Sequence, residues 1–434
     1  MRKARNLFLL SLLTGALTGL TASLYRWGLN GVNRLRERFF EAYGLRNPLM
    51  MLLILAVFIA VGQLLGLIGL AFPKISGSGI PQVKGVLLRT ISYARWKREL
   101  FFKFVTGILG IGCGLSLGRE GPSVQLGSYV GYGVTKLFGQ DETEERHLVT
   151  CGAGAGLAGA FGAPLAGVMF SLEELHRVIT PKLLISTFIG AVAADFIGRR
   201  FFGMQTAFNI TARYPTAINP FFHFGIMIVF AVIAAWFGKL FTRTLTRFQD
   251  GFRYINLTRR VKISIVMTTS FLLCLALPEV AGGGHALVES LEGTRESLIF
   301  LVFLFAVKFL FTAMSYSTGF AGGIFLPMLV LGAILGKIYA IVLIRFLGLG
   351  PEHIPHFIVL GMAAFFVAVV RAPLTGTVLI LEMTGTFDHL LALALVAAIS
   401  YYVTEQLRLA PVYDILYERM GKDRKHAAKG GATS

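Results

Sequence analysis

Charged residues are scarce in this chain of 434 residues: they make up 15% of it, whereas hydrophobic residues make up 55%. A soluble protein usually carries about 25% charged residues. The deficit indicates that lipid surrounds much of the surface, and it argues against a string of soluble domains. The hydropathy pattern predicts one continuous membrane domain over residues 1–434.

Acidic residues are the scarcer of the two charge types, with 23 against 41 basic residues and a formal net charge of +18. The basic residues lie mostly at the ends of apolar segments, where such charges set membrane orientation. No basic face repeats along a soluble element, so we expect no nucleic-acid partner. The basic residues near the two chain ends are Arg2, Lys3, Arg5, Lys422, Arg424, Lys425 and Lys429. They predict a multi-pass cell-membrane protein (the inner membrane in a Gram-negative bacterium) with both termini in the cytoplasm.

Cysteine is also rare. Cys113, Cys151 and Cys274 lie inside apolar segments and lack the spacing of metal ligands. We expect small buried thiols, with neither a metal nor a cofactor.

Long uninterrupted hydrophobic runs are few. A simple span needs about 20 apolar residues, but many segments here are shorter or are broken by some of the 50 Gly and 14 Pro residues. Irregular backbone at membrane depth is tolerated only where it is buried in protein or lines an aqueous cavity. The pattern therefore predicts an all-α polytopic fold of tilted and broken helices, typical of a transporter or channel.

The chain contains an internal repeat. The motif at residues 118–122 (GREGP) recurs 205 positions later at 323–327 (GIFLP), and residues 163–167 (APLAG) recur 209 positions later at 372–376 (APLTG). We infer two related halves, about 1–215 and 216–415, followed by a short basic tail over 416–434. Gly- and Pro-interrupted segments in corresponding halves point to a binding site near the membrane midplane.

Three glycine–proline loops each precede an apolar stretch and predict the start of a helix. Their residues are Gly77, Ser78, Gly79, Ile80 and Pro81; Gly118, Arg119, Glu120, Gly121 and Pro122; and Gly323, Ile324, Phe325, Leu326 and Pro327. The exposed amides and positive dipole at a helix start attract an anion. Neutral donors such as the Ser78 hydroxyl suit an ion that must be released again. We expect the three loops to converge on one anion site.

Several acidic residues lie near these loops or in the repeat. Glu120 is an acid in apolar surroundings, and such residues are functional candidates by default. Glu173 has a counterpart in Glu382, which favours a structural role shared by both halves. Glu174 aligns with Met383 and so breaks the symmetry, which makes it a candidate for a one-sided proton pathway.

Tyr413 follows Pro411 near the end of the last apolar region. Its surroundings in the sequence slightly favour an interfacial anchor, although its hydroxyl could instead cap an ion path.

These motifs, in this order, resemble the CLC family of chloride channels and chloride/proton antiporters. Residues 371–376 (RAPLTG) and 381–384 (LEMT) are similar to the second half of that family, and the likeness covers roughly residues 70–415. The resemblance implies two inverted repeats and a homodimer with one pore per subunit. We expect a compact prokaryotic-type member without the cytoplasmic regulatory domains of many eukaryotic members.

The resemblance also implies residue roles. Chloride is expected to bind the hydroxyls of Ser78 and Tyr413 and the backbone amides of Ile324 and Phe325. Glu120 matches the outer gating and proton-transfer glutamate, and Glu174 matches the inner proton-transfer glutamate of the antiporters. Lys84 departs from the family pattern, because antiporters often carry an acid there.

The expected function is therefore antiport of chloride and protons by a transporter rather than an enzyme. Two alternatives are a passive voltage- or proton-gated chloride channel and an antiporter for another small anion. An intramembrane serine hydrolase would need a histidine within hydrogen-bond reach of Ser78, and no histidine has a characteristic spacing to it. The sequence assigns no role to Asp195 or Lys308.

Overall fold

The structure is a computed structural model that describes residues 2–43, 47–216, 218–293 and 296–430, and the side chains within 6–421 of these ranges. The basic side chains at the chain ends, from Arg2 to Arg5 and from Lys422 to Lys429, and the last four residues of the expected tail lie outside the described residues. The described residues are mainly helical and contain no β-strand, only one isolated β-bridge. This confirms the all-α prediction.

The helices of the first half are α1 (Arg2–Tyr43), α2 (Pro48–Ala71), η2 (Pro73–Ile75), α3 (Ile80–Leu87), α4 (Trp96–Gly112), α5 (Glu120–Leu137), α6 (Glu142–Phe161), α7 (Pro164–Phe170), the π-helical turn η3 (Ser171–His176) and α8 (Pro181–Phe202). Those of the second half are α9 (Pro220–Tyr254), α10 (Arg259–Ala276), η4 (Pro278–Val280), α11 (His285–Ser290), α12 (Leu298–Ser317), α13 (Phe325–Leu347), η5 (Pro351–His353), α14 (Ile354–Val370), α15 (Pro373–Thr384), η6 (Phe387–His389), α16 (Leu390–Gln406) and α17 (Val412–Gly430).

Eight helical segments within the described ranges are long and apolar enough to cross a membrane. They are Asn6–Tyr43, Pro48–Ala71, Pro181–Phe202, Pro220–Tyr254, Leu298–Ser317, Phe325–Leu347, Pro351–Val370 and Phe387–Gln406. The prediction of a polytopic membrane protein is confirmed. The short helices α3, α7, α11 and α15 are fragments between breaks, as the Gly- and Pro-rich segments indicate.

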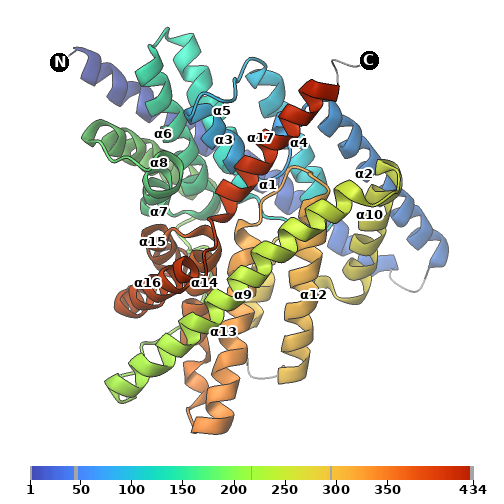
Figure 1. The fold of residues 1–434 in the computed structure, drawn as a ribbon, viewed down its shortest axis with the longest axis vertical. Helices are drawn as coiled ribbons and strands as arrows, with labels where there is room; N and C mark the ends of the chain where they lie inside the picture. The colour runs from blue at the N-terminus through green and yellow to red at the C-terminus, as the bar shows by residue number, and fades with distance from the viewer. Residues whose placement is uncertain (1, 44–46, 217, 294–295, 431–434) are drawn as a thin grey trace.

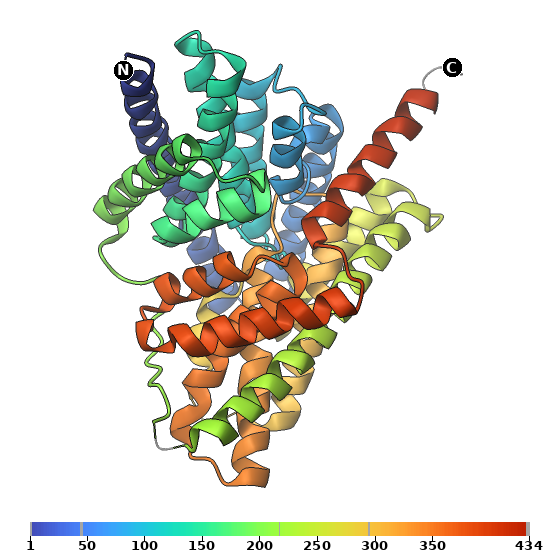
Figure 2. The ribbon, with the colours of Figure 1, turned by 60° about the vertical axis from the view of Figure 1, so that its left-hand side comes forward.

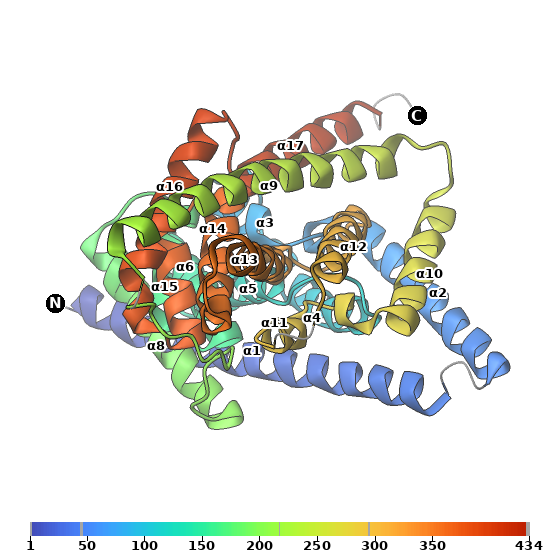
Figure 3. The ribbon, with the colours of Figure 1, turned by 90° about the horizontal axis from the view of Figure 1, so that it is seen from below.

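The two halves pack around a shared interior. The helices of the first half, blue to green, gather on one side of the molecule, and most of the second half lies below them (Figure 2). The final helix, α17, crosses back to the first half and contacts α3 (Figure 1). Seen from below, α5 and α13 lie near the centre and the long helices α1 and α9 lie at the periphery (Figure 3).

The repeat seen in the sequence is also a repeat of helix starts. The pairs η2/η4, α3/α11 and α5/α13 each begin 205 residues apart, and α7 and α15 begin 209 apart.

Small residues bring helices of each half close together. A Cβ at Gly127 would collide with the carbonyl of Gly152, and one at Gly332 would collide with the carbonyl of Gly361. The small residues at 152–159 therefore allow α6 to pack closely against α5.

The paired glutamates join the two halves. The carboxylate of Glu173 accepts hydrogen bonds from the amides of Leu374 (3.1 Å) and Thr375 (2.7 Å) at the start of α15. That of Glu382 accepts them from Leu165 (3.0 Å) and Ala166 (2.7 Å) at the start of α7. Each half thus caps a short helix of the other half with an acid. The positive end of the helix dipole stabilises the negative charge of the carboxylate.

Two buried lysines also obey the repeat. Lys103 Nζ donates to the carbonyls of Ile75 (2.8 Å) and Gly77 (2.7 Å), and Lys308 Nζ donates to those of Val280 and Gly282 (both 2.8 Å). Both lysines are completely buried, and neither has a carboxylate partner among the described residues. Lys308, which had no role from the sequence, therefore fixes the loop before α11 as Lys103 fixes the Ser78 loop.

We predict that Glu173→Ala and Glu382→Ala destabilise the protein to a similar extent. Each substitution removes a charged acceptor from two helix-start amides, which costs about 1–3 kcal/mol of unfolding free energy. Thermal unfolding of the purified protein in detergent, followed by intrinsic fluorescence, would measure the loss. Glu41→Ala, at an exposed position on α1, is the control. Equal midpoints for the glutamate variants and the control would contradict the cross-capping role.

Candidate ion-binding site

The three glycine–proline loops meet, and backbone hydrogen bonds join them. Gly118 N donates to Gly323 O (2.7 Å) and Gly323 N donates to Gly118 O (2.8 Å), which forms the isolated antiparallel bridge. Gly77 N donates to Gly319 O and Gly322 N donates to Gly77 O, both at 3.1 Å. Loops from both halves therefore form one rigid centre, as the sequence predicts.

Helices start at each of these loops, at Ile80, Glu120 and Phe325. The first four amides of a helix have no acceptor within that helix. Gly79, which precedes α3, has a left-handed backbone conformation (φ 93°), and a side chain there would collide with Gln125. Glycine at this position therefore allows the tight turn into α3 and its close approach to α5.

Two hydroxyl groups lie at this centre. Ser78 Oγ and Tyr413 Oη are both buried, and neither has a hydrogen-bond partner of normal geometry among the described residues. They are close enough to each other to interact, and Tyr413 also lies within electrostatic range of Glu120 and Glu174. Tyr413 is completely buried, so the interpretation as an interfacial anchor is wrong. Two unpaired hydroxyl donors in a dry site are suited to bind a small acceptor such as an anion.

Phe325 positions the first turn of α13 through aromatic packing. Its ring centroid lies 5.5 Å from that of Phe161, 6.2 Å from that of Phe170 and 4.8 Å from that of Phe366. All four side chains are buried. This packing keeps water away and fixes the helix start that carries the Ile324 and Phe325 amides.

Glu120 is the acid of this centre. Its carboxylate is completely buried, and neither oxygen makes a hydrogen bond of normal geometry with the described residues. The carboxylate does interact with the backbone amides of Glu120 and Leu326, at the starts of α5 and α13. Ser78 Oγ lies next to Gly121, where a Cβ would collide with it. The acid therefore lies at the same helix starts that could hold an anion.

Glu174 lies within a cluster of charged side chains. Its Oε1 is 3.6 Å from Lys84 Nζ, and its Oε2 is 3.9 Å from an Arg177 nitrogen. Asp414 forms direct ion pairs with Lys84 and, at 2.7 Å, with Arg177. The side chain of Glu174 is 3% exposed and that of Arg177 is 48% exposed. The cluster thus forms a polar path from a buried acid to the surface. Lys84, the departure from the family pattern, is the cation beside Glu174.

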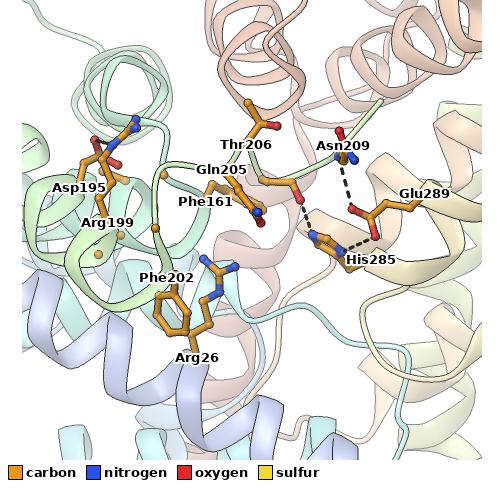
Figure 4. A pocket seen from close by; sticks show the side chains of 16 residues that line it. Arg26, Phe161, Asp195, Arg199, Phe202, Gln205, Thr206, Asn209, His285 and Glu289 are labelled. Carbon is orange, nitrogen blue, oxygen red and sulfur yellow. Dashed lines mark hydrogen bonds and ion pairs between the residues drawn. The ribbon is translucent and has the colours of Figure 1, made fainter. Parts of the chain in front are cut away.

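A second polar region lies between α1, the end of α6, α8, α11 and residues 203–209, around a cavity of ≈ 300 Å³ (Figure 4). The Arg26 guanidinium lies 4.2 Å from the ring centroid of Phe202 and has no carboxylate partner among the described residues. Phe161, which packs on Phe325, also lines this cavity. Arg26 has no recognisable signal in the sequence, because only the fold brings it near Arg119.

Asp195, which had no role from the sequence, lines this cavity as part of an ion pair. It pairs with Arg199 one turn later on α8, at 2.6 Å. On the other side, His285 interacts with the carbonyl of Ala207 and lies 3.9 Å from Glu289. Arg119 donates to the carbonyl of Ala160 (3.3 Å) and so links the loop before α5 to the end of α6.

The surroundings of Ser78 argue against the serine-hydrolase alternative. Ser78 Oγ has no histidine partner among the described residues, so the base required for a serine nucleophile is not positioned there. Cys113, Cys151 and Cys274 are free and buried, as predicted.

Comparison with known proteins agrees with this geometry. The family described as voltage gated chloride channel matches residues 61–405. The H(+)/Cl(-) exchange transporter ClcA of Vibrio parahaemolyticus is 32% identical over 97% of this chain and 91% of its own length. The protein of the same name from Cronobacter sakazakii is 32% identical over 95% of this chain and 89% of its own length.

Solved structures share the fold. A slow cyanobacterial Cl-/H+ antiporter has a TM-score of 0.89 and 29% identity, covering 95% of this chain and 97% of its own. A CLC-type fluoride/proton antiporter has a TM-score of 0.77 and 23% identity, covering 94% and 97%, and is evidence for the fold alone. With the two halves joined at their glycine loops and the family match across most of its length, this chain belongs to the voltage-gated chloride channel (CLC) family.

Proposed function

We propose that this chain is a chloride/proton antiporter, a transporter rather than an enzyme. The observation that carries the proposal is one buried centre that combines two hydroxyls without a partner of normal geometry, helix-start amides that have no acceptor within their own helices, and an acid. The names of the relatives, H(+)/Cl(-) exchange transporter and Cl-/H+ antiporter, support the same function.

The anion would bind the hydroxyls of Ser78 and Tyr413 and the amides of Ile324 and Phe325. These donors are neutral, so the ion is held by dipoles and can leave again. The two hydroxyls are buried and otherwise unpaired, and a chloride ion would accept their hydrogen bonds.

Glu120 would compete with the anion. As a carboxylate it is attracted to the same helix starts as chloride, here represented by the amides of Glu120 and Leu326. A protonated carboxyl loses that attraction and can leave the site. Alternate occupancy by chloride and carboxylate would link one movement to the other.

Glu174 is the feature that favours exchange over a passive channel. A channel needs no second proton carrier, but Glu174 is a nearly buried acid connected by charged groups to the surface. Tyr413 lies within electrostatic range of both Glu120 and Glu174. Protons would therefore reach Glu120 by way of Glu174 and cross the membrane against the direction of chloride.

The remaining partners are the bilayer and a second copy of the chain. Large apolar side chains on α8 are exposed, among them Ile185, Phe188 and Phe196, and Leu391 on α16 is exposed as well. Such surface needs lipid or protein contact, which is compatible with a homodimer whose subunits each hold a pore. The whole chain would form a single transport domain with both termini in the cytoplasm.

We predict that Glu120→Gln abolishes proton movement while chloride flux remains. In vesicles with the wild-type protein, a chloride gradient should drive a measurable pH change, and in the variant this change should fall to background. Glu352→Gln, at an exposed carboxylate, should behave like the wild type. If chloride moves through the wild type without any pH change, the exchanger is excluded and the channel alternative is supported.

We predict that Glu174→Gln also uncouples proton movement from chloride movement, in this case at the inner acid. The glutamine cannot carry a proton, so chloride flux should continue with proton movement reduced to background. Simultaneous recording with chloride and pH electrodes on reconstituted vesicles would measure both ions. Persistent proton pumping in this variant would remove Glu174 from the pathway.

We predict that Ser78→Ala and Tyr413→Phe each weaken chloride binding. Loss of one neutral hydrogen bond costs about 0.5–1.5 kcal/mol, or roughly two- to tenfold in affinity. Isothermal titration calorimetry would measure the change, with Tyr402→Phe, at an exposed tyrosine, as the matched control. Unchanged affinity in both variants would locate the anion elsewhere.

A further inference from the structure

The charged cluster around Glu174 contains two acids and two bases, Glu174, Asp414, Lys84 and Arg177. With all four side chains ionised, the cluster is electrically neutral. When Glu174 takes up a proton, the remaining three groups carry one excess positive charge. Lys84 and Glu174 are 8% and 3% exposed, so water screens this excess charge poorly.

The excess charge would lie close to the anion site. Lys84 is on α3, four residues after Ile80, where the helix that follows Ser78 begins. Asp414 directly follows Tyr413 in the sequence, and α17 packs on α3. At a rise of 1.5 Å per residue, the backbone of Lys84 lies about 6 Å along the α3 axis from that of Ile80, the first residue of the helix.

Other titratable groups near η3 have different partners. From α6, Arg146 and His147 interact with His176 and not with Glu174. From α16, Tyr401 interacts with Arg177. Facing Glu174 itself are Lys84 from α3, Tyr413 and Asp414 from α17, and Arg177 from its own segment.

Asp414 is held in its charged form. Burial alone would raise its pKa, but the hydrogen bonds and charges of Lys84 and Arg177 outweigh burial and lower the pKa of this carboxyl below its ordinary value. Asp414 therefore remains a fixed negative charge over the neutral pH range, and Glu174 is the member of the cluster that changes charge.

We propose that Lys84 and Asp414 set the charge balance through which a proton on Glu174 strengthens chloride binding at Ser78 and Tyr413. Both act as positioning residues. The proposal rests on the proposed antiport function and supplies it with an electrostatic link between the two ions. A proton entering from the side of Arg177 creates the positive charge that favours the anion.

The test is chloride affinity as a function of pH, measured by calorimetry on the full-length protein. The Glu120→Gln background removes the competing outer acid, so that the remaining pH dependence originates in the inner cluster. Affinity should rise as pH falls, and Glu174→Gln in this background should remove that dependence.

Substitutions of the two positioning residues should act in opposite directions. Lys84→Gln leaves the cluster one charge more negative, so it should weaken chloride binding and move the midpoint of the pH dependence up. Asp414→Asn should strengthen binding and move the midpoint down. A unit charge roughly 10 Å from an anion, at an effective dielectric constant of about 20, changes affinity by roughly tenfold.

The double variant Lys84→Gln/Asp414→Asn restores the charge balance and should restore both affinity and midpoint to within about twofold. Arg89→Gln, which removes a positive charge just after α3 from an exposed pair with Glu142, is the matched control. Changes of the same sign in both single variants, or no recovery in the double variant, would overturn the proposal. If the wild-type protein does not exchange chloride for protons in vesicles, the proposed function is overturned instead.

Discussion

The architecture depends on the pair of backbone hydrogen bonds between Gly118 and Gly323, one residue from each half of the chain. Because the bonded groups belong to the main chain, the link tolerates different side chains on either side of it. It brings the starts of α5 and α13 together and leaves their first amides free of intrahelical partners. A site that attracts anions therefore follows from how the halves are joined.

Function arises where the two halves differ. Glu120 corresponds to Phe325, Glu174 to Met383 and Ser78 to Gly283. The symmetric positions, such as Lys103 and Lys308, hold loops in place. The asymmetric positions supply an acid to one helix start, an aromatic ring to the other, and a second buried acid after α7 where α15 carries Met383. The two halves thus share their structural residues but differ in the acids and the aromatic ring that they place at the centre.

The sequence was sufficient to predict the helix starts, the repeat, the convergence of the loops and the shared structural role of Glu173 and Glu382. These depend on glycine, proline and charge at fixed spacing, which are local signals. The interpretation of Tyr413 as an interfacial anchor was wrong, because the burial of this side chain depends on α17 returning to α3. The sequence also indicated no partner for Lys84, because Asp414 lies 330 residues away. Arg26 has no local signal, because segments far apart in the sequence enclose its cavity, whereas Asp195 and Arg199 have the i, i+4 spacing of a helical ion pair.

The exchanged glutamate caps have an evolutionary consequence. Glu173 completes a helix of the second half and Glu382 completes one of the first, so neither half satisfies its own short helix. An ancestor of half this length would have needed a second copy of itself, lying in the opposite sense, to supply the missing carboxylate. Gene duplication and fusion would then have made permanent a partnership that single halves already required, and would have freed each copy to diverge.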